Sequence, residues 1–288
     1  MINRQLSEKL AGVLSADSGL DLRGEFIAED NGNKIIISPA GFHPTRGFKI
    51  KIQPGWKTID ASFVRGNLSK DLLFEMGHAF TENRSIFNLL VNNIRENGGI
   101  LRVNINGDNV RIDKSDLWPE TWHYLEIDLH SKPIEAYLDL NSDPEIFDYI
   151  LKWSYLFLSL IMTLLPLRDE MEEQIDQTGN IEGIKTQYDG DRYERNRVNR
   201  MACIAANGFR CKVCGFDFGK VYGQVGEGFI HVHHLIPLSQ SGDEGRVFDP
   251  VKELVPVCPN CHAMIHRKNP PYSLEEIRLM LMNNKEEN

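Results

Sequence analysis

Residues 211–214 read CKVC, and residues 253–266 read ELVPVCPNCHAMIH. The two C-x-x-C pairs contain four of the five cysteines in the chain. Two such pairs supply four thiolates, which satisfy tetrahedral zinc, whereas disulfide frameworks are typical of small secreted proteins. The spacing therefore predicts a structural zinc site made by Cys211, Cys214, Cys258 and Cys261.

Histidines gather beside these cysteines. Five of the nine lie in HVHHLIPLS at residues 231–239 and in HAMIH at residues 262–266. A purely structural zinc domain would need only the cysteines, so the histidines indicate further chemistry. His262 and His266 are four residues apart and share one face if this segment is helical.

In this order, CKVC, HVHHLIPLS and ELVPVCPNCHAMIH resemble the HNH nucleases, a family with a ββα-metal fold. The resemblance covers about residues 192–280 and requires two cysteine knuckles and the histidine motif to coincide. It implies a hairpin that carries the histidine pair, a helix that begins at the second knuckle, and zinc that joins the two. The fold class expected is α+β, with a mixed N-terminal domain followed by this zinc-stapled domain.

The resemblance also assigns roles. It implies that His234 is the general base, a role suited to an imidazole with a pKa of about 6.5. It implies that His233 and His262 hold a catalytic divalent ion, Mg²⁺ or Mn²⁺, which would stabilise charge on the phosphate and leaving oxygen. His266 is expected either as a third ligand or as a phosphate contact.

One position departs from the family pattern. Glu253 stands where the family usually has the asparagine that orients the loop bearing the base. A glutamate still accepts hydrogen bonds from backbone amides but adds negative charge, and Asp249 is close enough in sequence to share the task. We expect activity to be retained, and we expect His231 to be a strand residue that points near the site.

Basic residues flank the motifs. An arginine-rich segment, residues 192–212, predicts a helix that ends near residues 207–208, on which Cys203 is expected to be a buried thiol rather than a fifth ligand. The arginines are either a solvated, salt-bridged face or contacts to DNA phosphates, and the resemblance favours the second. The residues expected to contact nucleic acid are Arg192, Arg195, Arg197, Arg200, Arg267 and Lys268.

Short strands and amphipathic helices are expected earlier in the chain. Alternating apolar residues predict strands at residues 25–30, 34–40, 48–56, 61–66 and 122–130 and a hairpin at residues 100–113. Helices are expected after Ser69 and Thr81, each of which can act as an N-cap. Fifteen uncharged residues, 153–167, are too few for a membrane span and predict a buried helix. The expected domains are residues 1–167, an acidic linker at residues 168–191, and residues 192–288.

Charge separates the two parts of the chain. From residue 191 onward there are 13 basic and 12 acidic residues, whereas residues 1–190 contain 19 basic and 29 acidic ones. The net charge of the whole chain is −9. This balance excludes a protein coated in basic residues but leaves room for a local basic groove. The N-terminus shows no secretion signal, so a cytoplasmic protein without a membrane anchor is expected.

Three functions fit the sequence. The first is a restriction-type DNA endonuclease, similar to the McrA-like group, whose N-terminal domain reads modified DNA. In that case Phe42, Trp56, Trp118 and Trp122 either form a base-stacking pocket or pack as ordinary core aromatics. The second is an effector nuclease gated by a ligand or protein partner, and the third is a zinc-stapled DNA-binding protein that does not cut. A single site would nick, so cutting both strands needs a homodimer or two successive cuts.

Overall fold

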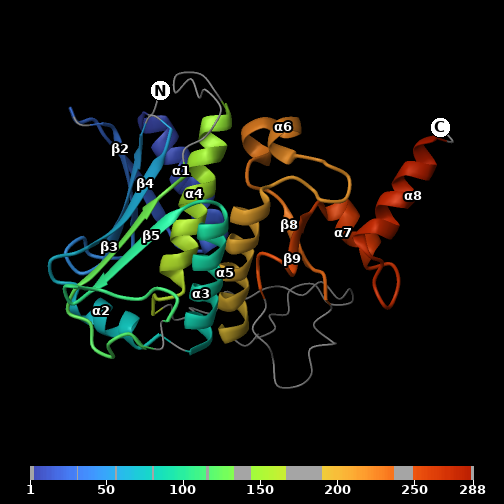
Figure 1. Cartoon of the computed structure of the whole chain (residues 1–288). Helices are drawn as coiled ribbons and strands as arrows, with labels where there is room; N and C mark the ends of the chain where they lie inside the picture. The colour runs from blue at the N-terminus through green and yellow to red at the C-terminus, as the bar shows by residue number, and fades with distance from the viewer. Residues whose placement is uncertain are drawn as a thin grey trace, which may run out of the picture.

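The computed structural model describes residues 3–30, 32–55, 57–79, 81–114, 117–132, 144–166, 190–236 and 249–286. These residues form a mixed α+β structure, which confirms the predicted fold class (Figure 1). The N-terminal elements are α1 (Arg4–Ser18), β1 (Leu22–Ile27), β2 (Lys34–Pro39), β3 (Phe48–Pro54), β4 (Ile59–Arg65), α2 (Lys70–Gly77), α3 (Thr81–Glu96), β5 (Ile100–Ile105), β6 (Asp108–Asn109), β7 (Leu125–His130) and α4 (Pro144–Met162). The C-terminal elements are α5 (Gly190–Asn207), α6 (Phe218–Tyr222), the 3-10 helix η2 (Gly223–Gly226), β8 (His231–His234), β9 (Leu254–Val257), α7 (Pro259–Ile265) and α8 (Leu274–Glu286).

Seven strands form one antiparallel sheet in the order β1-β2-β3-β4-β7-β5-β6. Buried and half-exposed residues alternate along β3, because successive side chains of a strand point to opposite faces. Phe48, Ile50 and Ile52 face the core, whereas Lys49 and Lys51 lie on the opposite, half-exposed face. The alternating segments therefore form strands as predicted, although β1 begins three residues before the predicted start at residue 25.

The hairpin predicted at residues 100–113 is present, with β5 paired to β6. Its turn consists of Asn106 and Gly107, whose φ angles are 57° and 98°. Positive φ at both central residues is typical of the type I′ turn, which Asn-Gly favours. The local sequence therefore determines this connection.

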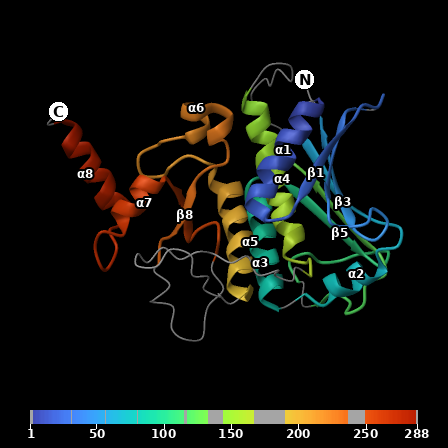
Figure 2. The same ribbon diagram turned by 180° about the vertical axis from the view of Figure 1, so that it is seen from behind.

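Helices α1, α3 and α4 cover the apolar face of the sheet (Figures 1 and 2). In α4, Tyr155, Phe157 and Leu160 are fully buried, which confirms the predicted core helix. Among the described residues, no helix has the length and hydropathy needed to cross a membrane.

The two predicted caps differ from expectation. Ser69 occupies the N-cap position of α2, but its hydroxyl donates to the Gly66 carbonyl at 2.8 Å and caps no helical amide. Thr81 is already the first residue of α3, so the cap falls on residue 80, outside the described residues. Both helices begin close to the predicted positions, but at α2 the Ser69 side chain does not cap the helix.

Helix α5 lies between the N-terminal helices and the C-terminal elements (Figures 1 and 2). Its buried residues, including Val198, Met201 and Ile204, join the same buried cluster as α4. The helix ends at Asn207 and is followed by Gly208, as predicted. The acidic linker predicted at residues 168–191 lies outside the described residues except for its last two positions.

Candidate active site

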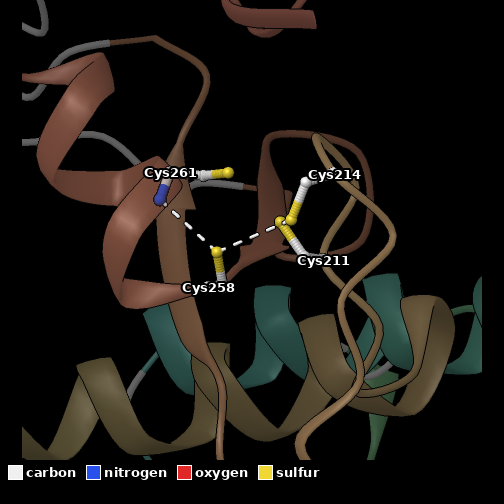
Figure 3. Close-up of side chains that lie close together, drawn as sticks. All are labelled: Cys211, Cys214, Cys258 and Cys261. Carbon is white, nitrogen blue, oxygen red and sulfur yellow. Dashed lines mark hydrogen bonds between the residues drawn. The ribbon is translucent and has the colours of Figure 1, made fainter. Parts of the chain in front are cut away.

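Four thiols converge in the C-terminal part of the chain (Figure 3). The sulfur atoms of Cys211, Cys214, Cys258 and Cys261 all lie within 4.8 Å of one another. The Sγ atoms of Cys214 and Cys258 are 3.7 Å apart. Tetrahedral zinc with bonds of about 2.3 Å places its sulfur ligands about 3.8 Å apart. The four residues therefore fit the zinc ion that their spacing predicts.

Backbone contacts explain how the two knuckles meet. The first knuckle turns at Gly215, whose φ is 75° and whose N–H donates to the Cys211 carbonyl at 2.9 Å. The Lys212 N–H donates to the Pro256 carbonyl at 2.9 Å, which attaches this knuckle to β9. The second knuckle begins α7, where Cys258 is the N-cap and its Sγ accepts from the Cys261 N–H at 3.4 Å. Zinc would therefore fix β9 and α7 to the first knuckle.

Cys203 lies apart from this group. It is fully buried in α5, and burial raises the pKa of its thiol to about 12. A thiol in such surroundings stays protonated and apolar, which confirms the expectation that Cys203 is a buried side chain.

A second group joins β8 to α7. One ring nitrogen from each of His233, His262 and His266 lies within 4.8 Å of the others. Burial, and then the neighbouring imidazoles of His262 and His266, lower the pKa of His233 to about 4. A neutral imidazole keeps the lone pair that a metal ligand needs. The three residues therefore form a nitrogen donor set that fits a divalent ion.

His231 precedes this group on the same strand. Its Nδ1 lies 3.2 Å from the Nδ1 of His262, and the two rings meet edge to face at 5.4 Å. The expected place of His231, on the strand and beside the site, is confirmed. The contact with His262 was not predicted, because a single sequence does not pair a strand residue with a helix residue 31 positions away.

His234 follows His233 on β8 and lies close enough to His233 and His262 to affect the pKa of both imidazoles. Burial lowers the pKa of His234, and the negative charge of Glu253 acts against this shift. The backbone also joins the two positions, because the Leu235 N–H donates to the Glu253 carbonyl at 2.9 Å. His234 is thus a neutral imidazole at neutral pH with a carboxylate in its environment.

Glu253 also organises the chain before β9. Its Oε1 accepts from the Asp249 N–H at 3.2 Å. Asp249 in turn accepts from the N–H groups of Val251 and Lys252, at 3.0 and 3.2 Å. The glutamate therefore makes the amide contact that we expected, and Asp249 shares the task of holding this turn.

The predicted nucleic-acid residues do not all face the same way. Arg200 donates to Asp17 of α1 at 2.9 Å and to the Ile230 carbonyl at 2.7 Å. Arg197 lies against the C-terminus of α1, since a Cβ built on Gly19 would be 1.8 Å from its Nη1. These two side chains therefore turn toward α1, which differs from the open phosphate-contacting face that the sequence predicts.

The remaining basic residues divide into two pairs. Arg267 and Lys268 are exposed just beyond α7, near the histidine group. Lys268 lies 3.9 Å from Glu276 and 4.9 Å from the ring centre of Tyr272. Arg192 and Arg195 belong to the first turns of α5, where the side chains lie outside the described ones.

The predicted base-stacking pocket is not formed by the tryptophans that the structure describes. Trp118 and Trp122 are buried, and Trp118 packs edge to face on Phe87 at 5.1 Å. They are core aromatics, which is the other expectation stated for them. Phe42 is exposed and packs on Phe48 at 6.2 Å, and Trp56 lies outside the described residues.

Two knuckles around a hairpin and a short helix that carry histidines define a ββα-metal domain. Residues 211–268 match the family model of the HNH endonucleases, so this segment is an HNH endonuclease domain. No curated protein and no solved structure matches the chain.

Proposed function

We propose that the chain is a metal-dependent DNA endonuclease that hydrolyses phosphodiester bonds at the histidine site of its HNH domain. The observation that carries this proposal is the convergence of His233, His262 and His266 within 4.8 Å, beside a further histidine, His234. Hydrolysis of a phosphodiester needs a base for water and a cation for the developing charge. The HNH match supports assigning both to these residues.

In this proposal His234 accepts the proton of the attacking water. Its lowered pKa supports that role, because the imidazole is neutral at neutral pH. Glu253 holds the turn before β9 and adds a carboxylate beside the base. Arg267 and Lys268, together with Arg192 and Arg195, contact phosphates of the substrate.

The metal ligands in this proposal are His233, His262 and His266. A divalent ion bound there would act as a Lewis acid for the phosphate and the leaving oxygen. Of the two ions expected from the sequence, Mn²⁺ suits three imidazoles better than Mg²⁺, which prefers oxygen ligands. The four cysteines hold structural zinc, and thiols that bind zinc are suited to the reducing cytoplasm.

We assign a restriction or defence role, in which the N-terminal domain reads modified DNA as in the McrA-like group. The support is the order of the predicted domains, in which an α+β part, residues 1–167, precedes the part that carries the HNH match, residues 192–288. One histidine site cuts one strand, so cutting both strands requires a homodimer or two successive cuts.

A nuclease gated by a ligand or partner is the second candidate. It is favoured by the bonds of Arg200, which run from Asp17 of α1 to the carbonyl of Ile230, just before β8. A change in the N-terminal body would therefore reach the strand that carries His233 and His234.

Cleavage of two plasmid preparations, one modified at cytosine and one unmodified, tests these proposals. Purified protein is incubated with Mn²⁺, with Mg²⁺ or without added divalent ion. Cutting confined to modified plasmid is the expected result. Equal cutting of both would reject the modification-dependent role for the modifications tested and favour the gated nuclease. Binding without cutting under all conditions would favour the third candidate, a zinc-stapled DNA-binding protein that does not cut.

A further inference from the structure

Aromatic side chains gather in the segment between the first cysteine knuckle and β8. Phe218 lies at the centre of this group and is parallel to Tyr222 at 5.8 Å, with 19° between the ring planes. Phe216 and Phe229 pack edge to face on Phe218 at 4.7 and 4.8 Å. We refer to Phe216, Phe218, Tyr222 and Phe229 as the aromatic ridge.

The ridge continues to the histidine site without a break. The ring of Phe229 meets that of His231 edge to face at 6.0 Å. His231 in turn contacts His262, with 3.2 Å between their Nδ1 atoms. Figures 1 and 2 both show α6, which carries Tyr222, above β8. A strand of nucleic acid that passes the histidine site would therefore reach the ridge next.

The outer rings of the ridge are exposed although their inner faces are packed. Tyr222 is 61% exposed and Phe229 is 47% exposed, and the neighbouring Val225 is 92% exposed. Phe216 and Phe218 pack against the buried cluster and support them from below. Tyr222 packs against Phe218 and Phe216, yet most of its surface remains exposed. Exposed apolar groups held rigidly beside a site are typical of binding surfaces.

Charged groups of both signs lie near the ridge. Asp217 accepts from the Lys220 N–H at 3.1 Å as the N-cap of α6. Glu227 forms an ion pair with Lys9 of α1 at 2.7 Å. Lys220 itself is exposed on α6. Asp217 and Glu227 therefore have partners. Asp148 of α4 interacts electrostatically with both of them and with Lys220 and Lys9.

We propose that the aromatic ridge stacks unpaired nucleobases next to the cleavage site, so that the substrate class is single-stranded or locally unpaired DNA. This inference rests on the proposed function, because it takes the histidine site as the place of cutting. A duplex presents only the edges of its bases in the grooves, whereas unpaired bases present faces that stack on aromatic rings. The exposed parts of the Tyr222 and Phe229 rings are available to such bases.

Binding to strands with and without bases tests the inference. An oligodeoxythymidine of about 20 nucleotides and an abasic strand of equal length carry the same phosphates, so they differ only in stacking. Fluorescence anisotropy without added divalent ions should show that the wild type binds the thymidine strand about fivefold tighter or more, as expected for one stacked base. Phe229→Leu and Tyr222→Leu keep an apolar side chain but should remove most of that preference without weakening abasic binding.

Phe74→Leu is the matched control, because Phe74 is an exposed phenylalanine on α2, outside the ridge. It should bind both strands like the wild type. Thermal unfolding of each variant verifies that the domain is folded. Equal binding of both strands by the wild type would overturn the inference, as would a loss in Phe74→Leu equal to that in the ridge variants.

Cleavage separates this inference from the proposed function. With Mn²⁺, the wild type should cut single strands faster than duplex, and Phe229→Leu should slow only the single-strand reaction. If the wild type and Phe229→Leu both cut duplex and single strands at equal rates, the base-stacking inference is wrong but the proposed nuclease activity is supported. A preference for base-bearing strands without any cutting would support the ridge while the proposed nuclease fails.

Discussion

Several histidines of the HNH domain have lowered pKa values. Burial lowers the pKa of His233, His234 and His262 below the usual value, in the case of His233 to about 4. An imidazole with a lowered pKa remains neutral as the pH falls below about 6.5, the value for a solvated histidine. These three imidazoles therefore stay neutral into mildly acidic conditions.

In the proposed nuclease, the charge of Glu253 is expected to affect the acidic limit of activity. Its carboxylate raises the pKa of His234 against the effect of burial. Glu253→Gln removes that charge, so the pKa of His234 should fall and the base should stay neutral to lower pH. We expect the acidic limb of the pH profile of kcat/KM to move to lower pH. A limb that stays in place or moves to higher pH would show that Glu253 does not act on the base, and Glu120→Gln is the control for an exposed acid far from it.

Cysteine labelling tests the zinc site. In the native protein, bound zinc should protect Cys211, Cys214, Cys258 and Cys261, although Cys214 is exposed. Burial, together with a pKa of about 12, should protect Cys203. Mass spectrometry after maleimide treatment should find no label in the native protein, four labels after zinc chelation and a fifth only after unfolding. Immediate labelling of Cys214 without chelation would argue against bound zinc.

The sequence predicts which cysteines and histidines come together better than it predicts contacts between distant segments. The C-x-x-C spacing and the position of His266 one turn after His262 follow from local geometry, and the structure brings these groups together. The contact of His231 with His262 and the ridge around Phe218 depend on packing between distant segments. A signal for the ridge was present in the repeated aromatics of residues 216–229, but spacing alone does not show that they meet.

Secondary-structure elements carry the coupling between the two parts of the chain. Asp17 of α1 accepts from Arg200 of α5 at 2.9 Å and from the hydroxyl of Tyr155 of α4. Arg200 also donates to the Ile230 carbonyl before β8. Asp17, Tyr155 and Ile230 are all buried. This network therefore joins α1, α4 and α5 to the start of β8, the strand that carries His233 and His234.

Asp17→Asn should destabilise this junction. The substitution keeps the shape but replaces a carboxylate that is bonded to a guanidinium, and such charged hydrogen bonds contribute about 1.5–3 kcal/mol. We expect the free energy of unfolding in urea to fall by about that amount. Glu8→Gln, in an exposed pair with Arg4, is the control and should change little. Equal stability of Asp17→Asn and wild type would mean that the network does not support the fold.

Strands were easier to predict than the first helix. Alternating apolar residues identify β2, β3 and β4, because their inner faces are uniformly apolar. Helix α1 was not predicted, since it buries Ser7, Asp17 and Ser18 beside Leu10 and Leu14, which obscures its apolar stripe. The start of β1 was missed because Gly24 interrupts the pattern where the strand lies against Ser7 of α1.

Among the described residues, most of the buried apolar side chains belong to one cluster. It extends from the sheet, for example Ile50, through α4 and α5 to Cys211 and Cys258 at the zinc site. The charge contrast and the acidic segment predict two separate domains, but sequence composition cannot show that α5 packs on α4 (Figure 1). The described residues of both parts therefore share a core.

Calorimetry tests this shared core. Because the cysteines and α5 belong to the same buried cluster, the chain should unfold in one transition. Chelation of zinc should move that whole transition to lower temperature, and added zinc should restore it. Two separate transitions, of which chelation moves only one, would contradict a shared core.

The most direct test of the account is nicking of supercoiled plasmid modified at cytosine, with Mn²⁺, by the wild type, by His234→Ala and by His123→Ala. His123 is an exposed histidine of the N-terminal part and controls for loss of an imidazole as such. The wild type and His123→Ala should nick at equal rates, whereas His234→Ala should lose at least about 100-fold, the lower range for a general base. Nicking by His234→Ala at the wild-type rate would contradict hydrolysis at this site.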